Sequence, residues 1–127
     1  MPKITPMREL AVGHVRYLAG LLEGEGCFYT QNYNKAGRHY VRVSLAMTDE
    51  DVVRGVHNLV ASGSVYCDHR SSRTSGKHSD YWRWTLNGTE AEKLMRLILP
   101  YMGQRRSRKI SEILFFSEQN RKLMKPD

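Results

Sequence analysis

The chain has 127 residues, 40% of them hydrophobic and 26% charged, which is typical of one globular domain with a real core. It carries 20 Lys and Arg against 13 Asp and Glu, so the formal net charge is +7. This excess favours a polyanionic partner, either nucleic acid or an acidic membrane surface. The apolar runs are too short to cross a membrane and no signal peptide is recognised, so we expect no membrane among the partners.

Residues 1–13 are expected to form an N-terminal lead, with a short helix that Thr5 and Pro6 open and Gly13 ends. An amphipathic helix follows over about residues 14–24, because apolar side chains recur there at i, i+3, i+4 and i+7: Val15, Leu18, Ala19 and Leu22. From residue 27 the pattern changes to that of strands. Residues 27–33 and 38–47 flank turn-forming residues and predict a hairpin, with clean alternation in its second strand.

The same pattern then repeats. The acidic cluster at residues 48–51 is expected to cap a helix. Strands follow around residues 65–70 and 81–86, joined by a basic Ser/Gly loop. Thr89 and Glu92 have the spacing of a capping box, which predicts another helix. Residues 100–103 interrupt that helix, a last helix begins at about Gln104, and residues 121–127 are expected to be a frayed tail.

This order of elements predicts a single α+β domain in which helices back one four-stranded antiparallel sheet. The opposite face of the sheet and its loops are rich in Arg, Lys, Tyr and Gln. A two-stranded ribbon can enter the major groove of DNA, where Arg and Gln read base edges. A plain solvated face is the alternative. The candidate DNA-binding residues are Tyr29, Gln31, Tyr33, Lys35, Arg38, Tyr40, Arg42, Ser44, Tyr66, Asp68, Arg70, Arg73, Lys77, Tyr81, Arg83 and Thr85.

The end of the first helix is locally unfavourable. Gly20 and Gly24 each weaken a helix by about 1 kcal/mol relative to Ala, and Glu23 and Glu25 lie where the helix dipole is negative. Glycines four apart on one face let a second helix approach closely. Carboxylates beside an unusual turn make an oxygen site for a divalent cation such as Mg²⁺. A Gly cap followed by a solvated acidic turn is the alternative.

Residues 18–26 read Leu-Ala-Gly-Leu-Leu-Glu-Gly-Glu-Gly and resemble the defining motif of the LAGLIDADG homing endonucleases. The resemblance extends over nearly the whole chain, because it implies an αββαββα fold with a saddle-shaped sheet. It implies a site-specific endonuclease of intron homing that breaks both strands of DNA and leaves 3′ overhangs. The motif occurs once, which implies a homodimer on a long pseudo-palindromic duplex. The two motif helices would then meet through Leu18, Ala19, Gly20, Glu23 and Gly24.

The resemblance also implies residue roles. Glu25 aligns with the metal-binding acid of the family and the Gly24 carbonyl with its backbone ligand for Mg²⁺, with Mn²⁺ or Ca²⁺ able to substitute in binding. Glu23 aligns with the other acid of the motif and is assigned mainly a structural or hydrogen-bonding role. Arg105 occupies the position of a catalytic Lys, but Arg exchanges no proton, so electrostatic stabilisation alone is expected. An equal alternative is that the basic residues Arg105, Arg106, Arg108 and Lys109 bind phosphates. Asp49 aligns with a water-positioning residue but is equally explained as a helix cap, which we favour.

Other functions stay open. A non-catalytic protein of this fold would act as an RNA-splicing maturase or a DNA-binding regulator, although the presence of Glu25 argues against lost catalysis. A basic RNA-binding domain with an aromatic sheet face is a more distant alternative. Cys27 and Cys67 lack zinc-site spacing and indicate no disulfide framework, which fits a reducing intracellular setting. We expect an organelle (a mitochondrion or chloroplast), or a prokaryotic or phage cytoplasm.

Overall fold

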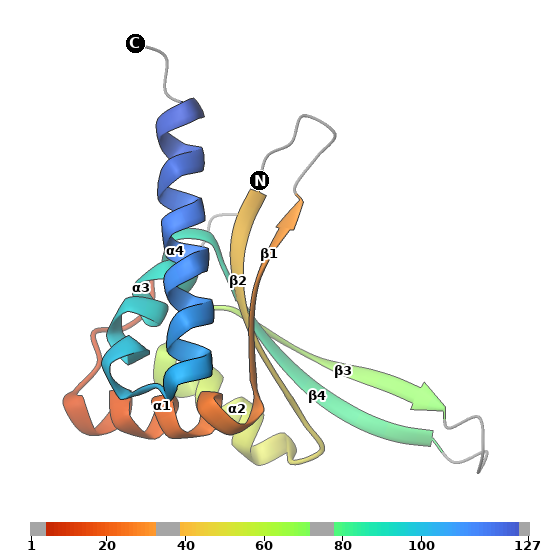
Figure 1. The fold of residues 1–127 in the computed structure, drawn as a ribbon. Helices are drawn as coiled ribbons and strands as arrows, with labels where there is room; N and C mark the ends of the chain where they lie inside the picture. Colours follow the sequence, from red (N-terminus) through yellow and green to blue (C-terminus); the bar gives the residue numbers. More distant parts are fainter. Residues whose placement is uncertain (1–4, 33–38, 72–77, 125–127) are drawn as a thin grey trace.

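A computed structural model describes residues 5–32, 39–71 and 78–124 (Figure 1). The elements appear in the predicted order of helix, two strands, helix, two strands and then helices. They are α1 (Val12–Glu25), β1 (Gly26–Asn32), β2 (His39–Met47), α2 (Glu50–Val60), β3 (Ser64–Ser71), β4 (His78–Asn87), α3 (Gly88–Ile98), the 3₁₀ turn η1 (Leu99–Tyr101) and α4 (Gln104–Met124).

The four strands form one antiparallel sheet in the order β1-β2-β4-β3, which confirms the predicted α+β class. Two hairpins, β1–β2 and β3–β4, meet through the central strands β2 and β4, where Leu45 pairs with Trp84. Figure 1 shows the hairpins diverging from this centre, so that the sheet is strongly twisted, while the helices gather on one side of it. Antiparallel strands carry this twist because each strand has a right-handed twist of its own.

The core lies between the sheet and the helices. Alternate residues of the strands turn toward the helices, as the period of two in β2 predicts. Trp84 is the largest fully buried side chain, and its Nε1 donates a hydrogen bond to the Ser62 carbonyl at 3.0 Å. The other fully or almost fully buried side chains of the core include Leu18, Leu22, Val43, Leu45, Val53, Val56, Leu86, Leu94, Met95, Ile98 and Ile110.

The N-terminal segment differs from the prediction. Residues 5–11 are not helical, and α1 begins at Val12 and runs through Gly13. The segment is instead attached by long-range bonds: the Met7 N–H donates to Glu90 Oε2 at 2.8 Å, and the Arg8 N–H donates to the Val60 carbonyl at 2.7 Å. These partners are distant in the sequence, so a local capping signal could not reveal them.

The capping-box interpretation of residues 89–92 is also wrong. α3 begins at Gly88, and its N-cap residue Asn87 makes no side-chain cap bond. Glu92 is buried and pairs with Arg121 of α4 at 2.6 Å, because a buried carboxylate needs a charged or hydrogen-bonding partner. Arg121 lies in the stretch 121–127 that was expected to fray, but α4 continues to Met124. Among the described residues, no helix is both long enough and apolar enough to cross a membrane.

Candidate nucleic-acid interface and acidic site

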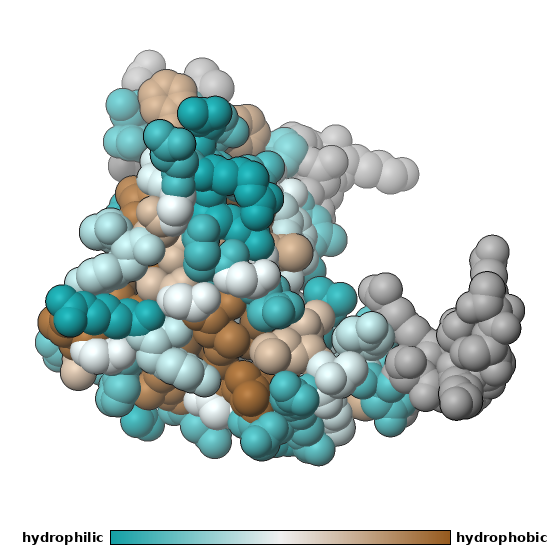
Figure 2. All heavy atoms as spheres, turned by 60° about the horizontal axis from the view of Figure 1, so that its bottom comes forward, coloured by the Kyte–Doolittle hydropathy of each residue, from teal (hydrophilic) through white to brown (hydrophobic). Residues whose placement is uncertain are grey.

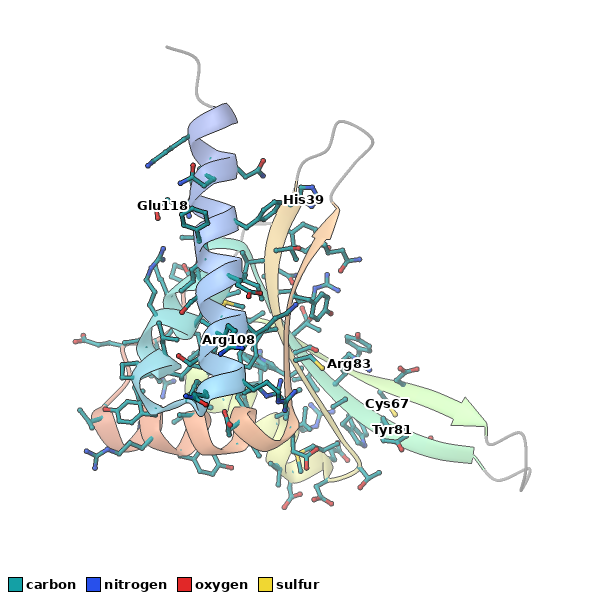
Figure 3. All side chains as sticks on the ribbon, viewed as in Figure 1. His39, Cys67, Tyr81, Arg83, Arg108 and Glu118 are labelled. Carbon is teal, nitrogen blue, oxygen red and sulfur yellow. The ribbon has the colours of Figure 1, made fainter. Side chains whose placement is uncertain are left out.

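The polar side chains of the strands share the face of the sheet that points away from the helices. The register places Tyr29 opposite Arg42, and Tyr66 opposite Arg83. Figure 3 shows Arg83 and Tyr81 on the lower hairpin. These residues occupy the predicted face of the sheet, together with Gln31, Tyr40 and Asp68, because successive side chains of a strand point to opposite faces. Arg70 lies in β3, whereas the loop candidates Tyr33, Lys35, Arg38, Arg73 and Lys77 lie outside the described residues.

Arg42 is the organising residue of this polar face. Its Nε donates to Asn87 Oδ1 at 2.7 Å, and its Nη2 donates to the Tyr40 hydroxyl at 2.9 Å. The guanidinium also lies over the rings of Tyr40 and Tyr29, at 5.3 and 5.9 Å from their centroids. Asn87 was not a sequence candidate, because its position before Gly88 reads as a turn. The cluster holds Arg42 in one orientation with part of its donor set already used.

Two candidates on this face are not available to a ligand. Ser44 and Thr85 pair across the central strands and are only 1% and 7% exposed. Both side chains are short, and they alternate along β2 and β4 with the longer Arg42 and Arg83. The expectation that they are presented to DNA is therefore wrong. Alternation predicts which face of the sheet a side chain is on, but it does not predict whether longer neighbouring side chains cover it.

Glu25 is the last residue of α1 and is exposed at the point where the helix passes directly into β1. The next residue, Gly26, has extended backbone angles, and its N–H still bonds to the Leu22 carbonyl. A Cβ at Gly26 would lie 2.7 Å from that carbonyl oxygen, so only glycine fits this abrupt turn from helix to strand. The turn places the Glu25 carboxylate at the edge of the sheet, since β1 is an edge strand.

Glu23 turns to a different part of the fold. Its Oε2 accepts a hydrogen bond from the Gly103 N–H at 3.3 Å, and its backbone carbonyl accepts one from Arg106 Nε at 3.2 Å. Glu23 therefore joins the end of α1 to the beginning of α4. The Glu25 carboxylate has no hydrogen-bond or ion-pair partner among the residues that the structure describes. The structural or hydrogen-bonding role of Glu23 stays a prediction, and these two bonds are the contacts on which it would depend.

The first turns of α4 place basic side chains beside β1. Arg105, Arg106 and Lys109 line a surface hollow together with Cys27, Phe28 and Tyr29. The Arg106 guanidinium lies over the Phe28 ring, 5.7 Å from its centroid. Arg105 is exposed, and it lines this hollow together with Cys27, which follows Glu25 by two residues.

Asp49 occupies the N-cap position of α2, but its side chain makes no cap bond. Its backbone carbonyl alone accepts the Val52 and Val53 N–H groups, at 3.1 and 3.2 Å. Capping by the side chain, which we favoured from the sequence, is therefore wrong. Asp49 follows β2, whose Leu45 pairs with Gly26, so it lies at the same end of the sheet as Glu25.

Comparison with solved structures decides the fold. The chain matches three homing endonucleases: I-CvuI in complex with its target in the presence of Ca²⁺, and the archaeal intron-encoded I-Vdi141I and the group I intron-encoded I-CeuI, both complexed with DNA. The chain has the LAGLIDADG homing-endonuclease fold. The TM-scores are 0.64, 0.57 and 0.55 at 16%, 17% and 15% identity, and the matches cover 84%, 86% and 89% of this chain.

The chain spans 67% of I-CvuI and of I-Vdi141I, and 59% of I-CeuI. No family model matches the sequence, and no curated protein matches it. The likeness is therefore one of backbone architecture, reached with few identical residues. The LAGLIDADG fold puts the motif helix, the polar sheet face and the start of α4 in the relation described above.

Among residues 5–32, 39–71 and 78–124, no other element covers one face of α1. Gly13, Tyr17, Gly20 and Gly24 follow one another at i, i+4, i+7 and i+11, and all four are exposed. A Cβ at any of these glycines would meet nothing within 4 Å. Figure 2 brings this side of the molecule forward and shows hydrophobic and near-neutral residues together there, with hydrophilic residues around them.

Leu18 and Ala19 do not belong to that exposed face. They are 0% and 2% exposed because they pack into the core of their own subunit. Their assignment to a dimer contact is therefore wrong, whereas Gly20 and Gly24 are open to a second helix. The apolar positions at i, i+3 and i+4 mark the inward face of an amphipathic helix, and the glycines mark the opposite one.

One subunit of the LAGLIDADG fold provides few ligands for a metal ion. Within the described ranges, no group of three or more His, Cys, Asp or Glu side chains is close enough to hold one. Both cysteines are free. The Glu25 carboxylate is a hard oxygen donor that suits Mg²⁺, but Mg²⁺ requires about six oxygen ligands. Further oxygens would have to come from a second subunit, water or a bound phosphate.

Proposed function

We propose that the chain is a homodimeric DNA endonuclease that hydrolyses one phosphodiester bond in each strand of a pseudo-palindromic duplex. The observation that carries this proposal is the exposed Glu25 carboxylate, which ends α1 beside a helix face that contains three exposed glycines. A single carboxylate is too weak a site alone, but two become an effective site when two such helices pack together. The DNA complexes of the three similar structures support the choice of substrate.

The glycine face of α1 is the proposed dimer contact. Small residues let two helices approach almost backbone to backbone, and an isologous contact brings the same residue of each subunit to the two-fold axis. The two Glu25 carboxylates then lie close together and repel each other unless cations lie between them. Exposed Tyr17 gives the same contact an apolar component.

Within the dimer, Glu25 and the Gly24 carbonyl would hold the divalent cation, which we take to be Mg²⁺. When bound, the cation would activate water and stabilise the leaving 3′ oxygen. Arg105 would stabilise negative charge on the scissile phosphate without exchanging a proton. Asp49 would position water at the same end of the sheet. Its carboxylate is available for this role because it makes no cap bond with α2.

The polar sheet face would bind the duplex on either side of the cleavage site. Tyr29, Gln31, Tyr40, Arg42 and Arg83 present hydrogen-bonding groups and aromatic rings suited to base edges and backbone. Each subunit contributes a net charge of +7, so affinity should fall steeply with salt as condensed cations are released. The two strands would be cut at staggered positions, so that each product end carries a 3′ overhang.

The test is cleavage of a library of duplexes with randomised sites in Mg²⁺ by the wild type and by Glu25→Gln. Glu112→Gln, which neutralises another exposed acid far along α4, is the matched control. We expect Mg²⁺-dependent double-strand breaks at one site, lost in Glu25→Gln with binding retained and unchanged in Glu112→Gln. Sequence-specific duplex binding without cleavage in Mg²⁺ or Mn²⁺ would make the chain a DNA-binding regulator. Preference for structured or single-stranded RNA would make it a maturase or an RNA-binding domain.

A further inference from the structure

We propose that the hollow between β1 and the first two turns of α4 binds a backbone phosphodiester of duplex DNA next to the scissile one. Arg106 and Lys109 would be its ligands. This inference rests on the proposed function and extends it, because it assigns a second phosphate site outside the acidic end of α1. The hollow is lined by Cys27, Phe28, Tyr29, Arg105, Arg106 and Lys109.

The lining contains three cations and no acid. Arg105 and Lys109 make no hydrogen bond or ion pair with any residue that the structure describes. Several cations elsewhere in the fold are compensated: Lys93 pairs with Glu90 at 3.0 Å, Arg121 with Glu92 at 2.6 Å, and Arg54 with Glu50 at 2.7 Å. Arg105 and Lys109 are therefore available to a ligand, and a ligand that these cations bind would be an anion.

The position of these cations on α4 is itself unfavourable. Arg105, Arg106, Arg108 and Lys109 lie within the first six residues of the helix, and its first turn contains no acid. The N-terminal end of a helix carries a partial positive charge, so cations there destabilise the protein. A bound phosphate relieves this repulsion, since anions are favoured beside a helix N-terminus.

Arg106 is held in place before any ligand arrives. Its Nε bonds to the Glu23 carbonyl and its guanidinium lies over the buried Phe28 ring. With Nε engaged, the two Nη groups remain, and a planar pair of donors matches two oxygens of one phosphate. Little side-chain entropy would be lost on binding, because the contacts with α1 and β1 already fix the side chain.

The location favours a phosphate of DNA over a free anion. Cys27 and Tyr29 point to the polar face of the sheet, where Tyr29 pairs with Arg42, so the hollow opens beside the proposed duplex surface. Cys27, which lines the hollow, also follows Glu25 by only two residues in the chain. A backbone that crosses Glu25 at the end of α1 would therefore pass the hollow with a neighbouring phosphate.

The test compares Lys109→Gln with Arg108→Gln by fluorescence anisotropy, using an arbitrary-sequence duplex in Ca²⁺ over a range of salt concentrations. Both substitutions remove one charge from the same turn of α4, but Arg108 does not line the hollow. We expect Lys109→Gln to weaken duplex binding about tenfold and to lower the salt slope by about one per subunit. Arg108→Gln should change both values much less.

Arg106→Lys is the second variant, because it keeps the charge but cannot both bond the Glu23 carbonyl and present a planar pair of donors. It should weaken duplex binding with little change in the salt slope, and thermal melting of each variant checks that the fold is kept. Equal effects of Lys109→Gln and Arg108→Gln would overturn the proposal, as they would reflect net charge alone. Binding of inorganic phosphate in the hollow without any duplex binding would also overturn it.

The binding assay does not depend on cleavage, so the two proposals can fail separately. Loss of duplex affinity in Lys109→Gln in a protein that never cleaves DNA would keep the phosphate site and remove the endonuclease. Normal cleavage and normal duplex binding by Lys109→Gln would keep the endonuclease and exclude the phosphate site.

Discussion

The Glu23 carboxylate accepts a hydrogen bond from the backbone N–H of Gly103, although 80 positions separate the two residues in the chain. The bond connects the last turn of α1 to the residue that precedes α4, and Arg106 adds a second link to the Glu23 carbonyl. These two bonds connect the end of α1, where Glu25 lies, directly to the basic residues at the start of α4.

Replacement of Gly103 should loosen this connection. A Cβ at Gly103 would lie 2.7 Å from Glu23 Oε1, so Gly103→Ala should displace the flexible carboxylate and remove its hydrogen bond. We expect unfolding in urea to show a loss of about 1 kcal/mol. Gly55→Ala in α2 is the control, since a Cβ there meets nothing and Ala favours a helix. A Gly103→Ala protein as stable as the wild type would show that the bond contributes nothing.

Enlarging the exposed glycines of α1 should break the dimer without unfolding the subunit. Gly20→Leu places a side chain in open space within one subunit, so the fold should be kept, but a close helix–helix contact would be blocked. Sedimentation should find a dimer for the wild type and a monomer for Gly20→Leu. Gly55→Leu offers an equally open position on another helix and should remain dimeric. If Gly20→Leu dimerises as tightly as the wild type, the contact lies elsewhere.

Arg42 should govern sequence discrimination more than overall affinity. Arg42→Lys keeps the charge but loses the geometry that Asn87 and Tyr40 support, so the salt slope of binding should be unchanged. Selection from a randomised library should show relaxed preference at one base pair, equivalent to about 1–3 kcal/mol. Asn87→Ala should weaken the same preference by a smaller amount. Unaltered selection by both variants would exclude Arg42 from base recognition.

Stability should depend on acid through Glu90. Burial raises the pKa of this carboxyl, but the Met7 N–H and Lys93 together outweigh burial, and the pKa lies below its ordinary value of 4.5. A lowered folded pKa contributes stability that is present above the unfolded pKa and is lost as pH falls through the folded one. Glu90→Gln should therefore reduce the free energy of unfolding at neutral pH and have less effect in strong acid. Equal effects at both pH values would contradict this account.

Local patterns in the sequence determined the buried faces of the helices and strands and the position of the acidic motif. Alternation in β2 and β4 predicted which face of the sheet meets the helices, and the spacing of Val15, Leu18 and Leu22 predicted the buried face of α1. The motif at residues 18–26 placed Glu25 at the end of that helix. These predictions succeed because the periods of helix and strand depend only on residues a few positions apart.

Only the tertiary structure decided which partner each polar side chain finds. From the sequence, Glu92 was expected to cap a helix, but it pairs with Arg121. Asn87 was expected to form a turn, but it accepts a hydrogen bond from Arg42. Ser44 was expected to face DNA, but it is buried. The basic hollow likewise exists only because α4 folds back against β1. Each of these contacts joins residues far apart in the chain, and a buried polar group takes whichever partner the packed fold brings to it.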